Sequence, residues 1–246
     1  MHITISEDAK TLGTIAGKKA ASLIRDALTQ KDAVTIILAT GTSQFETLRQ
    51  LVNERDIDWN KVTMFHLDEY VGLSEKHPAS FRKYLRERFI DQVPIKKYYL
   101  INGEAESSEE CGRLNALISR HVVDVALVGI GENGHLAFND PPADFNTESP
   151  YLVVELDDMC RKQQLGEGWF PTFEDVPRQA ISMSVKQIMK AKTLVCSVPD
   201  ERKAVAVKNT LQQPVSNLYP ASILQDHSNC FLFLDKASAS KLPHPA

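Results

Sequence analysis

A histidine follows three closely spaced glycines in this 246-residue chain. Gly129, Gly131 and Gly134 come directly after an apolar run, in a chain with only 11 glycines, and His135 is next. Histidine titrates near neutral pH and suits general acid–base chemistry, and Asp140, five residues on, can orient its imidazole. Glycines at a strand end also let a ligand approach the backbone closely. No amphipathic helix follows the run, so it does not match the dinucleotide-binding motif. The alternative to a ligand-binding role is a plain strand-to-helix turn.

The loop from Thr40 to Ser43 is a second candidate site, because it joins an apolar run to a helical pattern. Ser43 and Glu46 have the spacing of a capping box, which predicts a helix start there. The N–H groups and the positive dipole end of a helix start bind anions, and the lack of a Walker lysine favours a single phosphate over a nucleoside triphosphate. Lys203, near another predicted helix start, can add a positive charge. The alternative for the Thr40–Ser43 loop is an ordinary helix cap and turn, and the alternative for Lys203 is a surface lysine.

Two adjacent acids, Asp68 and Glu69, form a third candidate site. They follow the apolar strand predicted at 62–65 and precede Tyr70-Val71-Gly72. Adjacent acids are usually only solvated, but a carboxylate at a strand end can act as an acid–base group.

Apolar periodicity predicts the elements that position these residues. Spacings of three and four predict helices at 12–28, 78–89, 114–118, 185–189 and 204–211, with Pro78 at a first helical position. Apolar runs predict strands at 34–38, 62–65, 122–130, 151–156, 180–185, 194–198 and 231–234. Continuous apolar strands that alternate with helices predict one α/β domain over 1–246, Rossmann-like, with a mainly parallel sheet and helices on both faces. Within it, the polar stretch near 158–177 is expected to form a loop or lid.

Composition narrows the class of protein. A net charge of −4 argues against a general nucleic-acid binder. The four cysteines form no C-x-x-C pair, so neither a zinc ribbon nor a redox dithiol is expected, and reduced thiols fit a cytoplasmic protein. No run has the length of a membrane span, and residues 1–10 lack a signal core, so no membrane partner is expected.

Two longer motifs contain candidate residues, F-H-L-D-E-Y-V-G-L at 65–73 and G-I-G-E-N-G-H-L-A-F-N-D-P at 129–141. Both resemble the glucosamine-6-phosphate deaminases. The Thr40-Gly41 loop and the segment at 203–206 match the family in order and spacing, and the resemblance covers about residues 10 to 235. The wider superfamily includes 6-phosphogluconolactonases, which share the fold and the phosphate loop.

The resemblance implies an activity and a role for each site residue. The activity is isomerisation coupled to deamination, which converts glucosamine 6-phosphate and water into fructose 6-phosphate and ammonia. Asp68 would be the base that moves a proton between C2 and C1, and His135 would handle the proton on the ring oxygen, supported by Asn133 and Asp140. The phosphate of this small-molecule substrate would lie on Thr40, Gly41, Thr42, Ser43 and Lys203. The resemblance implies no metal and no cofactor.

The chain departs from the family pattern beside the histidine and in the lid. Many members have aspartate in place of Asn133 and glutamate in place of Asp140, and the shorter Asp140 is expected to lengthen the contact to His135 and alter its pKa. Where relatives have a phosphate-binding arginine before two phenylalanines, this chain has Gly168. Arg161 is the candidate to replace that arginine.

The segment at 147–157 lacks the basic residues that form the allosteric site of hexameric members. We therefore expect no activation by N-acetylglucosamine 6-phosphate, and a homo-oligomer stays open.

Two other functions remain as alternatives. A 6-phosphogluconolactonase-type hydrolase would keep the glycine-histidine run but leaves the run from Asp68 to Gly72 without a role. A non-catalytic sugar-phosphate sensor is disfavoured, because the chain is not basic and no DNA-binding module is expected before the domain.

Overall fold

A seven-stranded parallel sheet forms the centre of the computed structural model, which describes residues 1–243. Every neighbouring pair of its strands is parallel. In spatial order the strands are β1 (His2–Ser6), β10 (Cys230–Asp235), β9 (Thr193–Val198), β6 (Val125–Val128), β2 (Val34–Leu38), β3 (Val62–His66) and β5 (Lys97–Tyr99). The predicted α/β class with a mainly parallel sheet is confirmed.

The direction in which strands are added reverses between β2 and β6. From β2 the sheet grows through β3 to β5, whereas from β6 it grows through β9 and β10 to β1. The two strands at the reversal are paired, with Ile36 opposite Val125. In an open α/β sheet, ligands bind beyond the carboxyl ends of the strands at this point. The loops that follow β2 and β6 are the two glycine-bearing loops that the sequence singled out.

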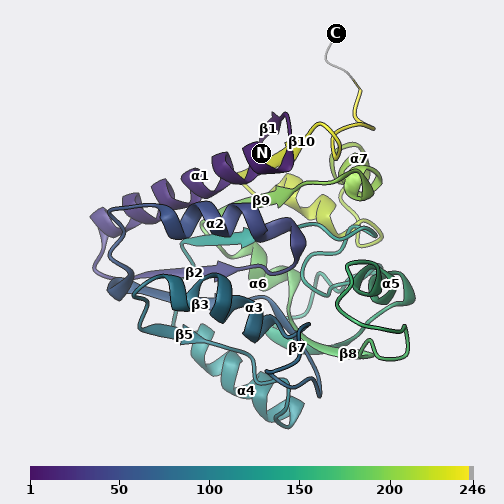
Figure 1. The fold of residues 1–246 in the computed structure, drawn as a ribbon, viewed down its shortest axis with the longest axis horizontal. Helices are drawn as coiled ribbons and strands as arrows, with labels where there is room; N and C mark the ends of the chain where they lie inside the picture. Colours follow the sequence, from purple (N-terminus) through teal and green to yellow (C-terminus); the bar gives the residue numbers. More distant parts are fainter. Residues whose placement is uncertain (244–246) are drawn as a thin grey trace.

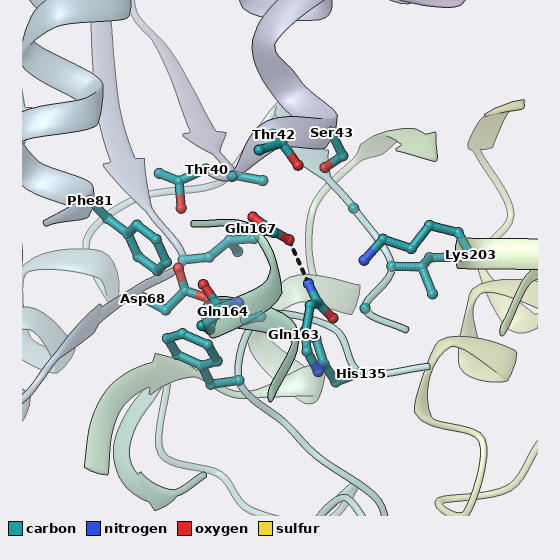
Figure 2. A pocket seen from close by; sticks show the side chains of 18 residues that line it. Thr40, Thr42, Ser43, Asp68, Phe81, His135, Gln163, Gln164, Glu167 and Lys203 are labelled. Atoms are coloured by element: carbon teal, nitrogen blue, oxygen red, sulfur yellow. Dashed lines mark hydrogen bonds between the residues drawn. The ribbon is translucent and has the colours of Figure 1, made fainter. Parts of the chain in front are cut away.

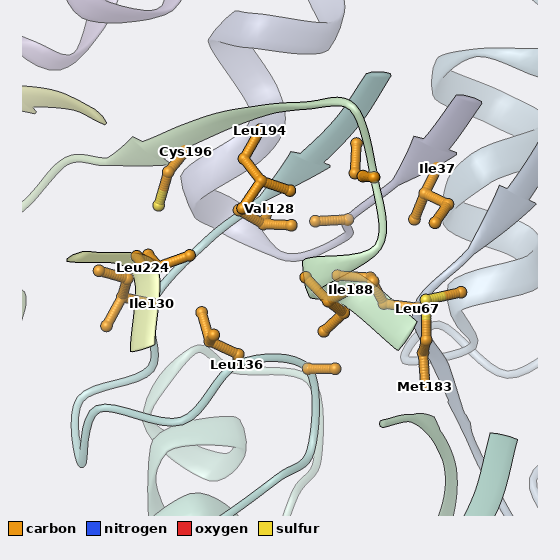
Figure 3. Packing of buried hydrophobic residues seen from close by; sticks show 14 of the residues in the cluster. Ile37, Leu67, Val128, Ile130, Leu136, Met183, Ile188, Leu194, Cys196 and Leu224 are labelled. Carbon is orange, nitrogen blue, oxygen red and sulfur yellow. The ribbon is translucent and has the colours of Figure 1, made fainter. Parts of the chain in front are cut away.

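Helices cover both faces of the sheet (Figure 1). One face packs against α1 (Ala9–Gln30), α2 (Phe45–Asn53) and α3 (Phe81–Arg88). The other packs against α4 (Ser107–Ile118), α6 (Val185–Met189) and α7 (Ala204–Gln212). Side chains of a strand alternate between these cores, so Ile36 packs on the first face and Ile37 on the second, beside Val128, Ile188 and Leu194 (Figure 3).

A second, three-stranded antiparallel sheet lies beside the main one. It consists of β4 (Asp68–Tyr70), β8 (Gln179–Met183) and β7 (Tyr151–Glu155). The strands predicted at 151–156 and 180–185 thus exist but belong to this small sheet. Because β4 follows β3 after a single residue, the small sheet fixes the chain where Asp68 leaves the main sheet.

Three local predictions are wrong. The capping box of Ser43 and Glu46 does not form, because the chain makes the 3₁₀ turn η1 (Thr42–Gln44) and α2 begins at Phe45 without a side-chain cap. The helix predicted from Pro78 begins at Phe81, since Ser80 caps it.

The third is the loop predicted for the stretch near 158–177, whereas its role as a lid stays a prediction. Its first part is the helix α5 (Asp158–Gly166), which forms because the Asp157 side chain accepts a hydrogen bond from the Cys160 N–H at 2.6 Å. Strands β1 and β5 were not predicted from the sequence. The remaining 3₁₀ turns are η2 (Trp59–Lys61), η3 (Ile90–Gln92), η4 (Glu201–Lys203) and η5 (Pro220–Asp226).

Two further predictions concern cysteines and membranes. All four cysteines are buried and free, as expected of reduced thiols. Among residues 1–243, no helix has both the length and the apolar character that a membrane span requires.

Candidate active site

A pocket of about 550 Å³ opens at the carboxyl ends of the central strands (Figure 2). It collects seven of the nine predicted site residues, namely Thr40, Gly41, Thr42, Ser43, Asp68, His135 and Lys203. The other two, Asn133 and Asp140, do not line it but contact His135 from behind. The structure therefore brings all nine residues into one place, although four separate segments of the chain carry them.

The loop after β2 presents the start of a helical segment to the pocket. Gly41 has a φ of 90°, a left-handed conformation that favours glycine, and η1 follows at once. The Tyr84 hydroxyl donates to the Gly41 carbonyl at 2.9 Å and fixes the loop. The first N–H groups of a helical segment have no partner within it, so this loop can bind an anion even without the predicted capping box.

Lys203 enters the pocket from the end of η4 (Figure 2). The residue is 5% exposed, and its ammonium forms no ion pair within residues 1–243. Burial lowers the pKa of Lys203, while the Glu167 and Glu132 carboxylates act in the opposite direction. A buried cation that faces a pocket without an ion-pair partner is suited to an anionic ligand.

His135 is held by two polar neighbours. Its Nδ1 lies 2.9 Å from Oδ1 of Asp140, and its backbone N–H donates to the Asn133 side-chain oxygen at 3.0 Å. The contact to Asp140 has an ordinary length, so the expected lengthening is wrong. Asn133 closes the arrangement, since its Nδ2 donates to Asp140 at 2.9 Å.

The charge on Asp140 decides which histidine nitrogen is free. Burial acts to raise the pKa of Asp140, but hydrogen bonds from His135, Asn133 and the Asp157 N–H together hold it below its usual value. An ionised carboxylate accepts the Nδ1 proton of His135, which leaves Nε2 toward the pocket as the group that can take up or release a proton.

Gly131 makes room for this ring. A Cβ at Gly131 would lie 2.2 Å from Nε2 of His135, well inside contact distance. Any side chain here would displace the imidazole. The second glycine of the motif is therefore needed for the position of the histidine.

Asp68 is the most perturbed acid of the pocket. The residue is 6% exposed, and its carboxyl forms no side-chain hydrogen bond within residues 1–243. Burial, followed by the neighbouring charge of Glu69, raises the pKa of Asp68 to about 8. A carboxylate that has lost its hydration and has a pKa near neutrality is a strong proton acceptor, as general base catalysis requires.

Glu69 points away from the pocket, so only one of the two adjacent acids can act there. Its carboxylate accepts from the Ser80 hydroxyl at 2.8 Å, from the Arg82 N–H at 2.9 Å and from Nε of Arg82 at 3.2 Å. These contacts hold the start of α3 against β4, and they stabilise a fully buried carboxylate.

Three lining residues of α5 and its C-terminal cap were not predicted, namely Gln163, Gln164 and Glu167. The Gln163 amide connects two parts of the site, because its oxygen accepts from the Glu132 N–H at 2.9 Å and its nitrogen donates to Glu167 at 3.0 Å (Figure 2). The Trp169 indole N–H also donates to Glu167, at 3.1 Å. The sequence does contain one signal for these residues, because a run of polar side chains follows Asp157, the residue that caps helix α5.

Arg161 does not replace the lid arginine of the resembling family. Its guanidinium donates to the carbonyls of Phe173 and Val176 at 2.8 and 3.0 Å, and the residue does not line the pocket. The structure places the acidic Glu167 in this part of the pocket wall instead.

Comparisons with known proteins agree with this geometry. The sequence model of the family described as glucosamine-6-phosphate isomerases/6-phosphogluconolactonase matches residues 7–233. The chain belongs to this family, which confirms the resemblance found in the motifs.

Individual relatives are similar over most of their length. A glucosamine-6-phosphate deaminase of Streptococcus suis is 42% identical over 206 residues, covering 83% of this chain and 86% of the relative. One of Listeria monocytogenes is 38% identical over 234 residues, covering 94% and 98%. The solved structure of a monomeric glucosamine-6-phosphate deaminase has a TM-score of 0.89 at 31% identity, over 98% of this chain and 99% of that one. A 6-phosphogluconolactonase from Thermotoga maritima shares the fold, with a TM-score of 0.79 at 15% identity over 96% and 99%.

Proposed function

We propose that this chain is a glucosamine-6-phosphate deaminase, which converts glucosamine 6-phosphate and water into fructose 6-phosphate and ammonia. One observation carries the proposal. A single pocket contains a dehydrated carboxyl, Asp68, an imidazole held by a carboxylate, His135, and an anion seat with a buried lysine, Lys203. The relatives that are named as deaminases support this choice, whereas the likeness to the lactonase extends to the fold alone.

The anion-binding site, formed by the loop from Thr40 to Ser43 and by Lys203, sets the orientation of the substrate. The 6-phosphate binds the loop from Thr40 to Ser43 and forms an ion pair with Lys203. This ion pair stabilises the ammonium, because a buried charge without a partner is unfavourable. The sugar then extends toward Asp68 and His135. Positioning by the phosphate supplies much of the binding energy and holds the reacting carbons against the base.

The two proton-transfer groups act in sequence. Nε2 of His135 exchanges the proton of the ring oxygen and opens the ring. Asp68 then removes the proton from C2, and the same proton is returned to C1. Asn133 and Asp140 are positioning residues that act through the histidine, because both contact it outside the pocket.

The segment at 158–177 serves as a lid over the sugar. Three residues near its middle line the pocket, and Asp157 ties its start to Asp140, since the Asp157 N–H donates to the Asp140 carboxylate at 3.0 Å. Lid position is therefore coupled to the carboxylate that orients the histidine. The four free, buried cysteines support a cytoplasmic location.

A coupled assay tests the proposal directly. Ammonium and fructose 6-phosphate are measured with glucosamine 6-phosphate, with galactosamine 6-phosphate and with 6-phosphogluconolactone as substrates. We expect equal amounts of both products from glucosamine 6-phosphate and no lactone hydrolysis. Lactone hydrolysis without ammonium release would favour the hydrolase, and binding without turnover of any compound would favour the sensor.

A further inference from the structure

Gln164 on α5 has one end of its amide fixed and the other end free in the pocket. Its Oε1 accepts a hydrogen bond from the Tyr70 hydroxyl at 2.8 Å. Within residues 1–243 its Nε2 has no hydrogen-bond acceptor, although the residue is only 5% exposed and lines the pocket. Because this nitrogen opens to the pocket and has no acceptor among residues 1–243, its N–H group is suited to an acceptor that a ligand brings.

Tyr70 determines which way the amide faces. The tyrosine is fully buried within β4, two residues after Asp68 in the chain. Burial raises the pKa of the Tyr70 hydroxyl far above its ordinary value, and the nearby Asp68 carboxylate adds to this effect. The hydroxyl therefore keeps its proton and donates it to Gln164. With the amide oxygen on the Tyr70 hydroxyl, the N–H groups of Gln164 remain available to a ligand in the pocket.

We propose that Gln164 donates a hydrogen bond to the C1 oxygen of the open-chain sugar and stabilises the negative charge that develops there. The inference rests on the proposed function. As Asp68 breaks the C2–H bond, that electron pair forms the C1=C2 double bond, and the π pair of the C1 carbonyl moves to the oxygen. The enolate oxygen then takes a proton from the substrate ammonium, and Asp68 returns its proton to C1. The iminium formed at C2 adds water and releases ammonia.

A neutral amide is a sensible donor at this position. Asp68 must accept a proton, and a permanent cation beside it would lower its pKa and weaken it as a base. An amide N–H adds no charge, but its hydrogen bond strengthens as charge builds on the oxygen, so its effect belongs to the transition state. The rigid Tyr70 contact orients it in advance.

The test compares Gln164→Leu with wild type and with Gln187→Leu, a matched loss of a nearly buried amide outside the pocket. For whichever amino-sugar phosphate the wild type turns over, Gln164→Leu should lower kcat roughly 100-fold and leave KM within about threefold. Gln187→Leu should keep wild-type kcat. A loss confined to KM, or no loss in kcat, would overturn the proposal.

A binding measurement separates this proposal from the proposed function. Calorimetry with arabinonohydroxamate 5-phosphate, an enediolate mimic, should show roughly 30-fold weaker binding to Gln164→Leu. With 2-amino-2-deoxyglucitol 6-phosphate, which has no carbonyl, the change should stay within about threefold. Equal losses for both compounds would contradict the role of Gln164. Failure of the wild type to release ammonium would refute the deaminase proposal without changing this comparison.

Discussion

Replacing Asp68 with asparagine should stabilise the protein while it abolishes turnover. The carboxyl of Asp68 is buried, and its pKa in the folded protein is about 8, against 3.8 for an ordinary aspartate. The folded state therefore binds this proton far more tightly than the unfolded chain does. The stability that the protonated carboxyl contributes is complete below pH 3.8 and is lost as the pH rises toward 8.

The two pKa values set the size of the effect. At pH 7, ionisation of the carboxyl favours the unfolded chain by up to about 4 kcal/mol, whereas at pH 5 the same difference is only about 2 kcal/mol. An asparagine does not ionise in either state, so Asp68→Asn should gain this free energy. For a chain of this length, that corresponds to a rise in Tm of roughly 10 °C at pH 7 and about half as much at pH 5.

Thermal unfolding of wild type and variant at both pH values measures this prediction. Asp91→Asn, a substitution of an exposed aspartate in η3, is the control and should leave Tm nearly unchanged at both. A rise in Tm for Asp68→Asn that is equal at pH 5 and pH 7 would refute the reasoning, because it would mean that the carboxyl titrates normally.

Three further predictions concern ionisation and buried charge. First, kcat/KM should rise about tenfold per pH unit below pH 7.5 and level off above about pH 8, as Asp68 ionises; a plateau that begins at pH 5 would exclude Asp68 as the base. Second, Arg82→Met should destabilise the protein by about 3–5 kcal/mol in urea unfolding, because it leaves the buried Glu69 unpaired, whereas Arg86→Met at an exposed pair should cost under about 1 kcal/mol. Equal costs would contradict the structural role of the first pair. Third, Asp140→Asn should lower kcat at least about 100-fold with KM nearly unchanged in steady-state kinetics, since the imidazole loses the charge that orients it; a larger effect on KM than on kcat would count against this role.

Local sequence predicted those parts of the site that local geometry determines. His135 and Asp140 are only five residues apart, and the glycines before them permit a tight loop, so their contact could be expected from the sequence itself. The parallel strands could also be predicted from the sequence, because burial on both faces favours a nearly continuous apolar run such as Val34–Leu38, which only Thr35 interrupts.

The remaining features depend on contacts between distant segments. Gln164 gained its orientation from Tyr70, 94 residues earlier in the chain, and no periodicity in the sequence encodes that pair. The small antiparallel sheet likewise pairs Tyr70 with Ala180. The capping box failed for a related reason, since the Ser43 side chain contacts the Gln44 amide and does not cap the helix. Tertiary contacts thus replaced a local motif of the right spacing.

The central claim is that Asp68, opposite an anion seat and an oriented histidine, is the base of an amino-sugar-phosphate deaminase. Its most direct test is the stoichiometry of ammonium and fructose 6-phosphate released from glucosamine 6-phosphate by wild type and by Asp68→Asn. Binding of 2-amino-2-deoxyglucitol 6-phosphate is measured in parallel by calorimetry. We predict a one-to-one ratio of products from the wild type, and no product from the variant although it binds the amino alcohol. Ammonium release by Asp68→Asn at the wild-type rate would contradict the account.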